Sequence, residues 1–226
     1  MTYTQVEKAV FLDRPNRFIA NVLLDGAPVV CHVKNTGRCR ELLIPGSEVY
    51  LQRADKPGRR TGWDLIAVQK GSRLINMDAA APNAVFGEWL RAGGAGAVPQ
   101  LLRPECTHGD SRFDFYFELG ERRIFAEVKG VTLEEDGIVR FPDAPTERGV
   151  KHLRGLSRCT AEGYEAWAVF VIQMAEVRWF EPNRQTHPAF ADALCDAAAA
   201  GVRLLAMDCA VTPDSLSLRD CVEVRL

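Results

Sequence analysis

Short apolar stretches separated by turn residues fill the first 80 positions of the chain. Pairs such as Asp25-Gly26 and Pro45-Gly46 mark turns, and the alternation of apolar and polar residues between the turns is typical of strands. We expect five strands, at residues 6–12, 17–24, 29–33, 48–53 and 63–68. Five short strands in this length predict a small barrel of the OB type, with another small antiparallel sheet as the alternative.

From residue 81 onward, helical and extended patterns alternate. Helices are expected at residues 83–91, 146–162 (with Thr146 as the N-cap) and 188–200. Strands are expected at residues 112–119, 122–129, 139–141 (extending the same sheet), 166–174, 202–207 and 222–226. This alternation predicts an α/β (α+β) fold in which helices flank a mixed sheet. The change of pattern near residue 80 predicts two domains, 1–80 and 81–226.

The composition is that of an ordinary globular protein, with 47% hydrophobic and 26% charged residues among 226. No apolar run approaches the roughly 20 residues that span a bilayer. The N-terminal segment lacks the basic start and apolar core of a signal peptide, so we expect a cytoplasmic protein without membrane contact. The seven cysteines include no CxxC pair, which disfavours disulfides and a structural zinc site.

Charge differs between the two predicted domains. The net charge of −2 disfavours a strongly basic nucleic-acid binder. Residues 1–80 nevertheless hold 12 Lys/Arg against 8 Asp/Glu, a net of +4, whereas residues 81–226 hold 16 against 22, a net of −6. A basic first half and an acidic second half indicate modules with different tasks.

Several enzyme classes lack their motifs here. The sequence contains no P-loop, no GxGxxG after a strand and no GxSxG elbow, and its four histidines form no zinc-binding cluster. Gln173 ends a predicted buried strand. It either points into a functional site or has its amide satisfied by the backbone.

The strongest chemical signal lies in RFDFYFELGERRIFAEVKG, residues 112–130. Alternation predicts a strand whose apolar face carries Phe113, Phe115, Phe117 and Leu119, and a two-residue turn at Gly120-Glu121 leads into a second strand. In that register Asp114 lies opposite Glu127, on one face with Lys129. Opposed side chains have Cβ atoms about 4.5–5.5 Å apart, so two bare carboxylates would repel each other there.

A hard divalent cation would turn this repulsion into attraction. Mg²⁺ takes one or two carboxylates and keeps its other positions for water and phosphate oxygens, while a nearby lysine can orient water or neutralise a phosphate. We therefore predict a Mg²⁺ (or Mn²⁺) site at Asp114 and Glu127, with the Val128 carbonyl as a third ligand and Lys129 as the catalytic amine. The alternative is a solvated surface pair of little consequence.

The spacing Asp–x12–Glu–x–Lys resembles the PD-(D/E)xK nuclease superfamily, although Phe113 stands where a proline often precedes the aspartate. In that superfamily a helix before the hairpin often supplies another acid. The resemblance gives this role to Glu88, whose alternative is a solvent-facing helix residue.

A more specific resemblance covers nearly the whole chain. The sugar fermentation stimulation protein A (SfsA) family is similar in the segments NTGRCRELLIPG (35–46), SRFDF (111–115), EVKGVTLEEDG (127–137), FPDAPTERGVKHL (141–153) and VFVIQ (169–173). Cys39 departs from a methionine, and Val33-Lys34 depart from Cys-Pro, in the family's pattern. The resemblance implies an OB-type N-terminal module, a nuclease-like C-terminal module and DNA binding with little sequence preference. The family name suggests regulation of sugar metabolism, which no residue pattern explains.

Basic residues that could meet DNA phosphates occur in both halves. A helix from Thr146 places Lys151, Arg154 and Arg158 on one stripe. The family resemblance sets this helix beside the hairpin, which favours phosphate contacts for Lys151 and Arg154. For Arg158 an ordinary solvated position is favoured.

The loop after residue 33 could also follow a phosphate backbone, through Lys34, Arg38 and Arg40. Holding the two modules together is the alternative for Asn35 and Arg38. Three aromatic residues are available to stack bases, although aromatics on short strands usually belong to the core: Phe18, Tyr50 and Trp63.

Two functions are consistent with these patterns. The first is a Mg²⁺-dependent nuclease acting on single- or double-stranded DNA without sequence specificity. The second is a non-catalytic DNA-binding regulatory protein on a nuclease fold, and a weaker third is a protein-interaction module. The sequence does not indicate an oligomeric state.

Overall fold

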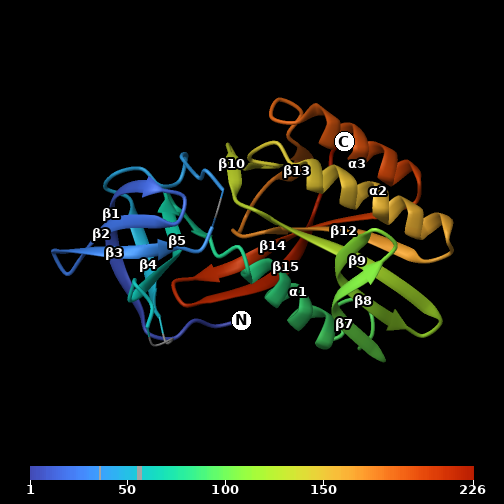
Figure 1. The fold of residues 1–226 in the computed structure, drawn as a ribbon, viewed down its shortest axis with the longest axis horizontal. Helices are drawn as coiled ribbons and strands as arrows, with labels where there is room; N and C mark the ends of the chain where they lie inside the picture. Colours follow the sequence, from blue (N-terminus) through green and yellow to red (C-terminus); the bar gives the residue numbers. More distant parts are fainter. Residues whose placement is uncertain (36, 55–57) are drawn as a thin grey trace.

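The computed structural model describes residues 1–35, 37–54 and 58–226, which form a β-barrel followed by an α/β unit (Figure 1). The barrel sheet has the strand order β3-β2-β1-β4-β5-β6, and a further pairing of β3 with β5 closes it. Its strands are β1 (Val6–Asn16), β2 (Ile19–Leu24), β3 (Ala27–Val33), β4 (Glu48–Arg53), β5 (Trp63–Lys70) and β6 (Arg73–Asn76). The predicted OB-type barrel is confirmed, and β6 is a strand that the pattern did not predict.

The barrel forms because alternate residues of its strands are apolar and point inward. Phe11, Val22, Cys31, Val49 and Leu65 are all at most 1% exposed. In β1 and β4 these inward residues alternate with more exposed ones, whereas β5 is buried on both faces from Asp64 to Val68.

The second half is built on a mixed sheet with the order β15-β14-β12-β9-β8-β7. The three central strands β9, β12 and β14 are parallel, and the outer strands pair antiparallel. The bounds are β7 (Leu101–His108), β8 (Ser111–Leu119), β9 (Arg122–Val131), β12 (Glu165–Ile172), β14 (Arg203–Thr212) and β15 (Ser215–Val222). The predicted mixed sheet with flanking helices is confirmed.

Two helices pack on this sheet, and a third packs on one of them. Helix α1 (Ala81–Arg91) packs against β9 and β15, while α2 (Glu147–Ala161) packs against β8, β9 and β12 and also contacts α3 (Pro188–Ala199). The Thr146 hydroxyl accepts a hydrogen bond from the Gly149 N–H at 3.1 Å, so the predicted N-cap is confirmed. No helix in the described part of the chain is long and apolar enough to cross a membrane.

The predicted extension of the main sheet at residues 139–141 is wrong. Strand β11 (Ile138–Phe141) pairs instead with β10 (Leu133–Glu135) and β13 (Trp179–Pro182), and these neighbours occupy both of its edges. The last strand lies earlier in the chain than predicted. Strand β15 covers Ser215–Val222, so only Val222 of the predicted strand 222–226 belongs to it. Strand β7 went unpredicted because it is a largely exposed edge strand containing Pro104, without apolar alternation.

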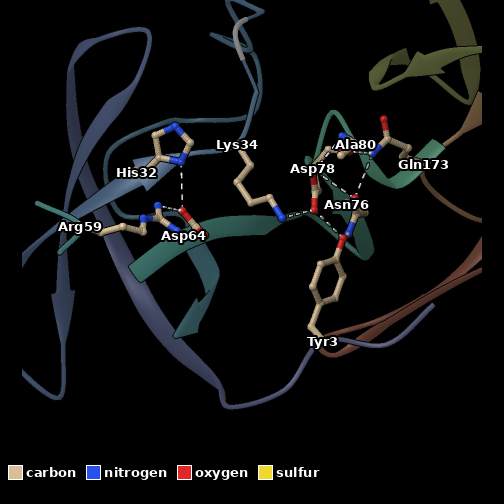
Figure 2. Close-up of polar contacts among 9 residues, drawn as sticks. All are labelled: Tyr3, His32, Lys34, Arg59, Asp64, Asn76, Asp78, Ala80 and Gln173. Carbon is tan, nitrogen blue, oxygen red and sulfur yellow. Dashed lines mark hydrogen bonds and ion pairs between the residues drawn. The ribbon is translucent and has the colours of Figure 1, made fainter. Parts of the chain in front are cut away.

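Buried polar contacts join the barrel to the α/β unit. Gln173 is 2% exposed, and its amide donates to the Asn76 Oδ1 at 2.9 Å and to the Asp78 carbonyl at 3.0 Å (Figure 2). Glu134 of β10 accepts from Lys70 and Arg73 of the barrel, each at 2.7 Å. Gln173 therefore holds the segment between β6 and α1 in place.

Candidate functional site

The β8–β9 hairpin brings the predicted acids close together. Leu119 pairs with Arg122 across the turn, and Gly120 has a φ of +62°, as the first position of a type II′ turn requires. The paired register runs back to Phe115 and Ala126, where the ladder ends. Asp114 and Glu127 occupy the next position, at the point where the strands stop pairing.

The regular alternation of β8 breaks at Asp114. Phe115 packs in the apolar cluster that includes α1, whereas Phe113 packs in the cluster that includes α2. Residues two apart on a regular strand share a face, so the predicted single apolar face through Phe113 is wrong. At this break the Asp114 carboxylate accepts two hydrogen bonds. Its Oδ2 accepts from the Val128 N–H at 2.7 Å, and its Oδ1 accepts from the Asn83 amide at 2.8 Å.

Glu127 is almost completely buried, with 4% of its surface exposed. Its Oε1 accepts from both the Lys129 ammonium and the His152 Nδ1. Its Oε2 is buried and has no hydrogen-bond partner among the described residues. One carboxylate oxygen thus takes two donors while the other is left open.

His152 is a member of this cluster that sequence reasoning missed. The Arg148 Nε donates to the His152 Nε2 at 3.4 Å, so the geometry assigns the ring proton to Nδ1, which donates to Glu127. A signal was available, because His152 lies three residues after Gly149 and four before Leu156, on the buried side of α2. Asn83 was missed as well, since nothing in the sequence distinguishes it from other polar residues of α1.

The surroundings shift the pKa values of the two acids in opposite directions. Burial and the negative charge of Glu127 raise the pKa of Asp114, and the hydrogen bonds from Val128 and Asn83 offset this only in part. Burial also raises the pKa of Glu127, but His152 and Lys129 outweigh it and hold that pKa below its usual value. The surroundings therefore favour the carboxylate form of Glu127 and disfavour that of Asp114, and a bound cation would favour both carboxylates.

The donor set fits a hard divalent cation bound mainly through water and substrate. The unpartnered Oε2 of Glu127 is a buried acceptor beside a second carboxyl. Within the described residues, no group of three or more His, Cys, Asp or Glu side chains is arranged to hold a metal ion. Two carboxylates match Mg²⁺, which usually keeps several waters, better than a fully protein-bound metal.

Glu88 does not join the cluster. Its carboxylate accepts from the amino group of Met1 at 2.6 Å, and its side chain is 54% exposed. The N-terminal segment lies along β15, where Thr2 bridges to Ser215. The helix that was expected to supply an acid supplies Asn83 instead, because Asn83 lies near the start of α1 and Glu88 more than one turn further on.

The predicted stripe on α2 faces solvent, away from Glu127. Lys151 and Arg154 are exposed and border a surface depression of about 530 Å³. Asp110 lies in the same depression, where it forms an ion pair with Arg158 and lies 3.8 Å from the Lys151 ammonium. The negative charge of Asp110 therefore offsets part of the stripe.

The three basic residues of the barrel loop separate into two groups. Arg38 and Arg40 border a groove of about 480 Å³ with Arg14 and Arg17, and Ala144 of the α/β unit lines the same groove. Lys34 lines a different pocket, and its ammonium lies 2.5 Å from the Asp78 carboxylate.

Among the aromatic candidates, only Phe18 has a largely exposed ring surface. Its exposure is 46%, and the Arg17 guanidinium lies 5.2 Å from its ring centroid. The Tyr50 hydroxyl donates to Glu48 at 2.6 Å, and Trp63 packs against the core.

Comparisons with known proteins agree along the whole chain. The family models described as "Sugar fermentation stimulation protein RE domain" and "SfsA N-terminal OB domain" match residues 80–215 and 12–77. Sugar fermentation stimulation protein homologs of Desulfitobacterium hafniense (strain Y51) and Clostridium beijerinckii are 59% and 54% identical, over 100% of this chain and 99% and 100% of theirs.

A solved structure shows the same arrangement. The structure of Pyrococcus furiosus SfsA in complex with Ca²⁺ matches with a TM-score of 0.89 and 26% identity, covering 100% of this chain and 98% of that one. The chain therefore belongs to the SfsA family, with an N-terminal OB domain and a restriction-endonuclease-like domain.

Proposed function

We propose that this protein is a DNA-binding, Mg²⁺- or Mn²⁺-dependent nuclease that hydrolyses phosphodiester bonds with little sequence preference. Residues 1–80 would bind the strand and residues 81–226 would cut it. One observation carries the proposal: the buried Oε2 of Glu127 has no hydrogen-bond partner among the described residues and lies beside the carboxyl of Asp114.

Each residue of the cluster has a distinct role in this proposal. Asp114 and Glu127 would hold the cation, with the Val128 carbonyl as a further ligand. When bound, the metal would polarise the phosphate and lower the pKa of a water. Lys129 would orient the attacking water or neutralise charge on the phosphate. His152 holds Glu127 in place through Nδ1. The Pyrococcus furiosus SfsA structure is a complex with Ca²⁺, which supports a divalent cation in this family.

Two basic surfaces would hold the DNA. Arg38 and Arg40 border the groove that reaches Ala144 at the α/β unit, and Phe18 offers an exposed ring for an unpaired base. Lys151 and Arg154 border the second surface on α2. Because such contacts release counterions, binding would weaken linearly in log–log form as salt rises.

Cleavage by the purified protein tests the proposal. Single- and double-stranded DNA are incubated with Mg²⁺, Mn²⁺ or EDTA. We expect cleavage only with metal, and loss of cleavage in Lys129→Ala. Lys8→Ala is the matched control, because Lys8 is a 64% exposed lysine on the barrel. Equal cleavage by the wild type and Lys129→Ala would identify a contaminating nuclease and refute the assignment.

The alternative is a DNA-binding regulatory protein on a nuclease fold. The observation in its favour is that the Lys129 ammonium is engaged by Glu127, which also binds His152. A lysine held in this way is less available for a water or phosphate. Salt-sensitive DNA binding without metal-dependent cleavage would favour this alternative.

A further inference from the structure

A further polar pocket lies on the outer surface of the barrel, and none of its described lining residues belongs to the acidic cluster. Its volume is about 490 Å³. Adjacent strands bring its wall together, because Asp64 of β5 pairs with His32 of β3 on one side and with Gln52 of β4 on the other. The described residues that line it are His32, Lys34, Gln52, Arg53, Ala54, Arg59 and Asp64.

Asp64 organises this wall. It is 7% exposed. The Arg59 guanidinium donates to both of its oxygens at 2.8 and 2.5 Å, and the His32 Nδ1 lies 3.0 Å from Oδ1. Figure 2 shows His32 and Arg59 both directed at this carboxylate. Burial raises the pKa of Asp64, but these hydrogen bonds outweigh it and hold the pKa below its usual value. Asp64 is thus an anion that fixes two cationic or hydrogen-bonding side chains.

The fixed side chains keep donors free for a ligand. Asp64 accepts from the Nδ1–H of His32, so the Nε2 of the same ring donates to a phosphate only in the protonated imidazolium. A guanidinium has five N–H groups, and two of those of Arg59 are used by Asp64. The Arg53 side chain lines the same pocket and has no hydrogen-bond or ion-pair partner in the part of the chain that the structure describes.

Lys34 completes the pocket from the side of the α/β unit. Its ammonium pairs with Asp78 at 2.5 Å, and Asp78 is 1% exposed. Asp78 lies between β6 and α1, where it also accepts from the Ala80 N–H at 2.9 Å and the Tyr3 hydroxyl at 3.3 Å. Figure 2 shows the Lys34 side chain leading away from His32 and Arg59 toward Asp78. Its stem therefore borders the pocket, while its ammonium is held by Asp78.

We propose that this pocket binds a phosphate group, carried by a mononucleotide or by a nucleic-acid strand. Arg53, Arg59 and His32 line it beside the stem of Lys34. Asp64, the acid among the described lining residues, is paired within the wall. Phosphate oxygens accept from arginine forks, and the volume is that of a small-ligand site. The pocket shares no described lining residue with the acidic cluster, and binding there requires no cleavage.

Binding without any divalent metal tests the site separately from hydrolysis. In EDTA, calorimetry measures the affinity for inorganic phosphate, adenosine 5′-monophosphate, and a short single-stranded oligonucleotide with and without a 5′-phosphate. We expect Arg53→Gln to weaken binding of the phosphate-bearing probes about tenfold, since charge-assisted hydrogen bonds contribute that much. Arg60→Gln is the matched control: Arg60 is exposed, close in sequence and not among the lining residues.

The imidazole of His32 gives a second measurement. The chain has four histidines, and His32→Gln identifies the ring signals of His32 in a nitrogen-detected NMR spectrum. We expect phosphate to shift the His32 Nε2 signal and to leave those of the other rings in place. A shift caused by Asp64 alone would occur without the ligand, so this signal reports the occupied pocket.

The probes distinguish the source of the phosphate. Mononucleotide binding as tight as oligonucleotide binding supports a nucleotide pocket, while tighter binding of the 5′-phosphorylated oligonucleotide supports a strand end. Equal binding of both oligonucleotides, weakened in Arg53→Gln, supports a backbone phosphate. The inference is overturned if no probe binds, if Arg53→Gln and Arg60→Gln behave alike, or if the His32 signals do not move.

Discussion

Glu127 and Glu134 are equally buried, at 4% exposure each, yet their carboxylates are satisfied very differently. In Glu134 the Oε2 accepts from Lys70, and the Oε1 accepts from Arg73 and the Gly137 N–H. In Glu127 a single oxygen takes both donors and the other takes none. Burial alone therefore does not distinguish these two acids, whereas the distribution of partners over the two oxygens does.

The difference has an energetic reason. Leaving a buried acceptor unsatisfied costs about 1–3 kcal/mol. Glu134 avoids this cost by joining the barrel to the α/β unit with every oxygen bonded. Glu127 carries this cost at its unpartnered Oε2. Burial and the charge of Glu127 also raise the pKa of the neighbouring Asp114. A divalent cation would remove both penalties at once.

The largest expected effect is on DNA cleavage, and it concerns Glu127. Glu127→Gln removes the charge that would hold the metal, and we expect metal-dependent DNA cleavage to fall at least about a hundredfold, as loss of one electrostatic group in a catalytic site typically does. Glu121→Gln, in the exposed hairpin turn, is the matched control. Cleavage rates under single-turnover conditions measure the effect. Full activity in Glu127→Gln would remove this residue from the site.

For the free energy of unfolding, we expect the larger effect at Glu134. Glu134→Gln leaves Lys70 and Arg73 without their anion, and we expect the free energy of unfolding to drop by about 2–3 kcal/mol. This is less than for a fully buried pair, because the two cations are each about a third exposed. Denaturant unfolding measures it. Unchanged stability would show that the junction does not depend on this ion pair.

The pH dependence provides the control for Glu134. Lys70, Arg73 and Gly137 outweigh burial and hold the pKa of Glu134 below its usual value. Its stabilising contribution is therefore fully present above the unfolded pKa of about 4.3 and is lost as pH falls through the lower folded value. The difference between wild type and Glu134→Gln should shrink in this acid window. A difference that persists at the lowest pH would have another cause.

The smallest expected change in stability is at Asp114. Asp114→Asn removes a charge that burial and Glu127 disfavour, and Asn83 can rotate its amide to meet the new side chain. We expect less than about 1 kcal/mol of change without metal. Mg²⁺ bound at the two acids would stabilise the wild type by about 2.7 kcal/mol at a hundred times its Kd, and we expect this stabilisation to disappear in Asp114→Asn. Thermal unfolding with and without Mg²⁺ measures both, and a retained metal effect would contradict the role of Asp114.

Local signals explain what the sequence could predict. A two-residue turn at Gly120-Glu121 fixes the register of the hairpin, so the proximity of Asp114, Glu127 and Lys129 followed from spacing alone. The barrel strands were predictable because their apolar residues alternate. The family assignment rested on long matching segments, and the comparisons confirm it.

Tertiary contacts explain what it could not predict. His152 and Asn83 reach the acids from helices that only the fold brings to the hairpin. The break at Asp114 could not be predicted, because both faces of the sheet are apolar and Phe113 fits the core on each of them. The resemblance predicted that Glu88 supplies a further acid, because it lies on a helix before the hairpin. Its position along α1 instead brings its carboxylate to the Met1 amino group.

A crystal soaked in Mn²⁺ tests the metal site at the two acids most directly. We predict an anomalous difference peak within bonding distance of the Asp114 carboxylate and the Oε2 of Glu127, and no such peak in Glu127→Gln crystals. Crystals of the wild type that show no peak there, with Mn²⁺ bound elsewhere, would contradict the proposed site.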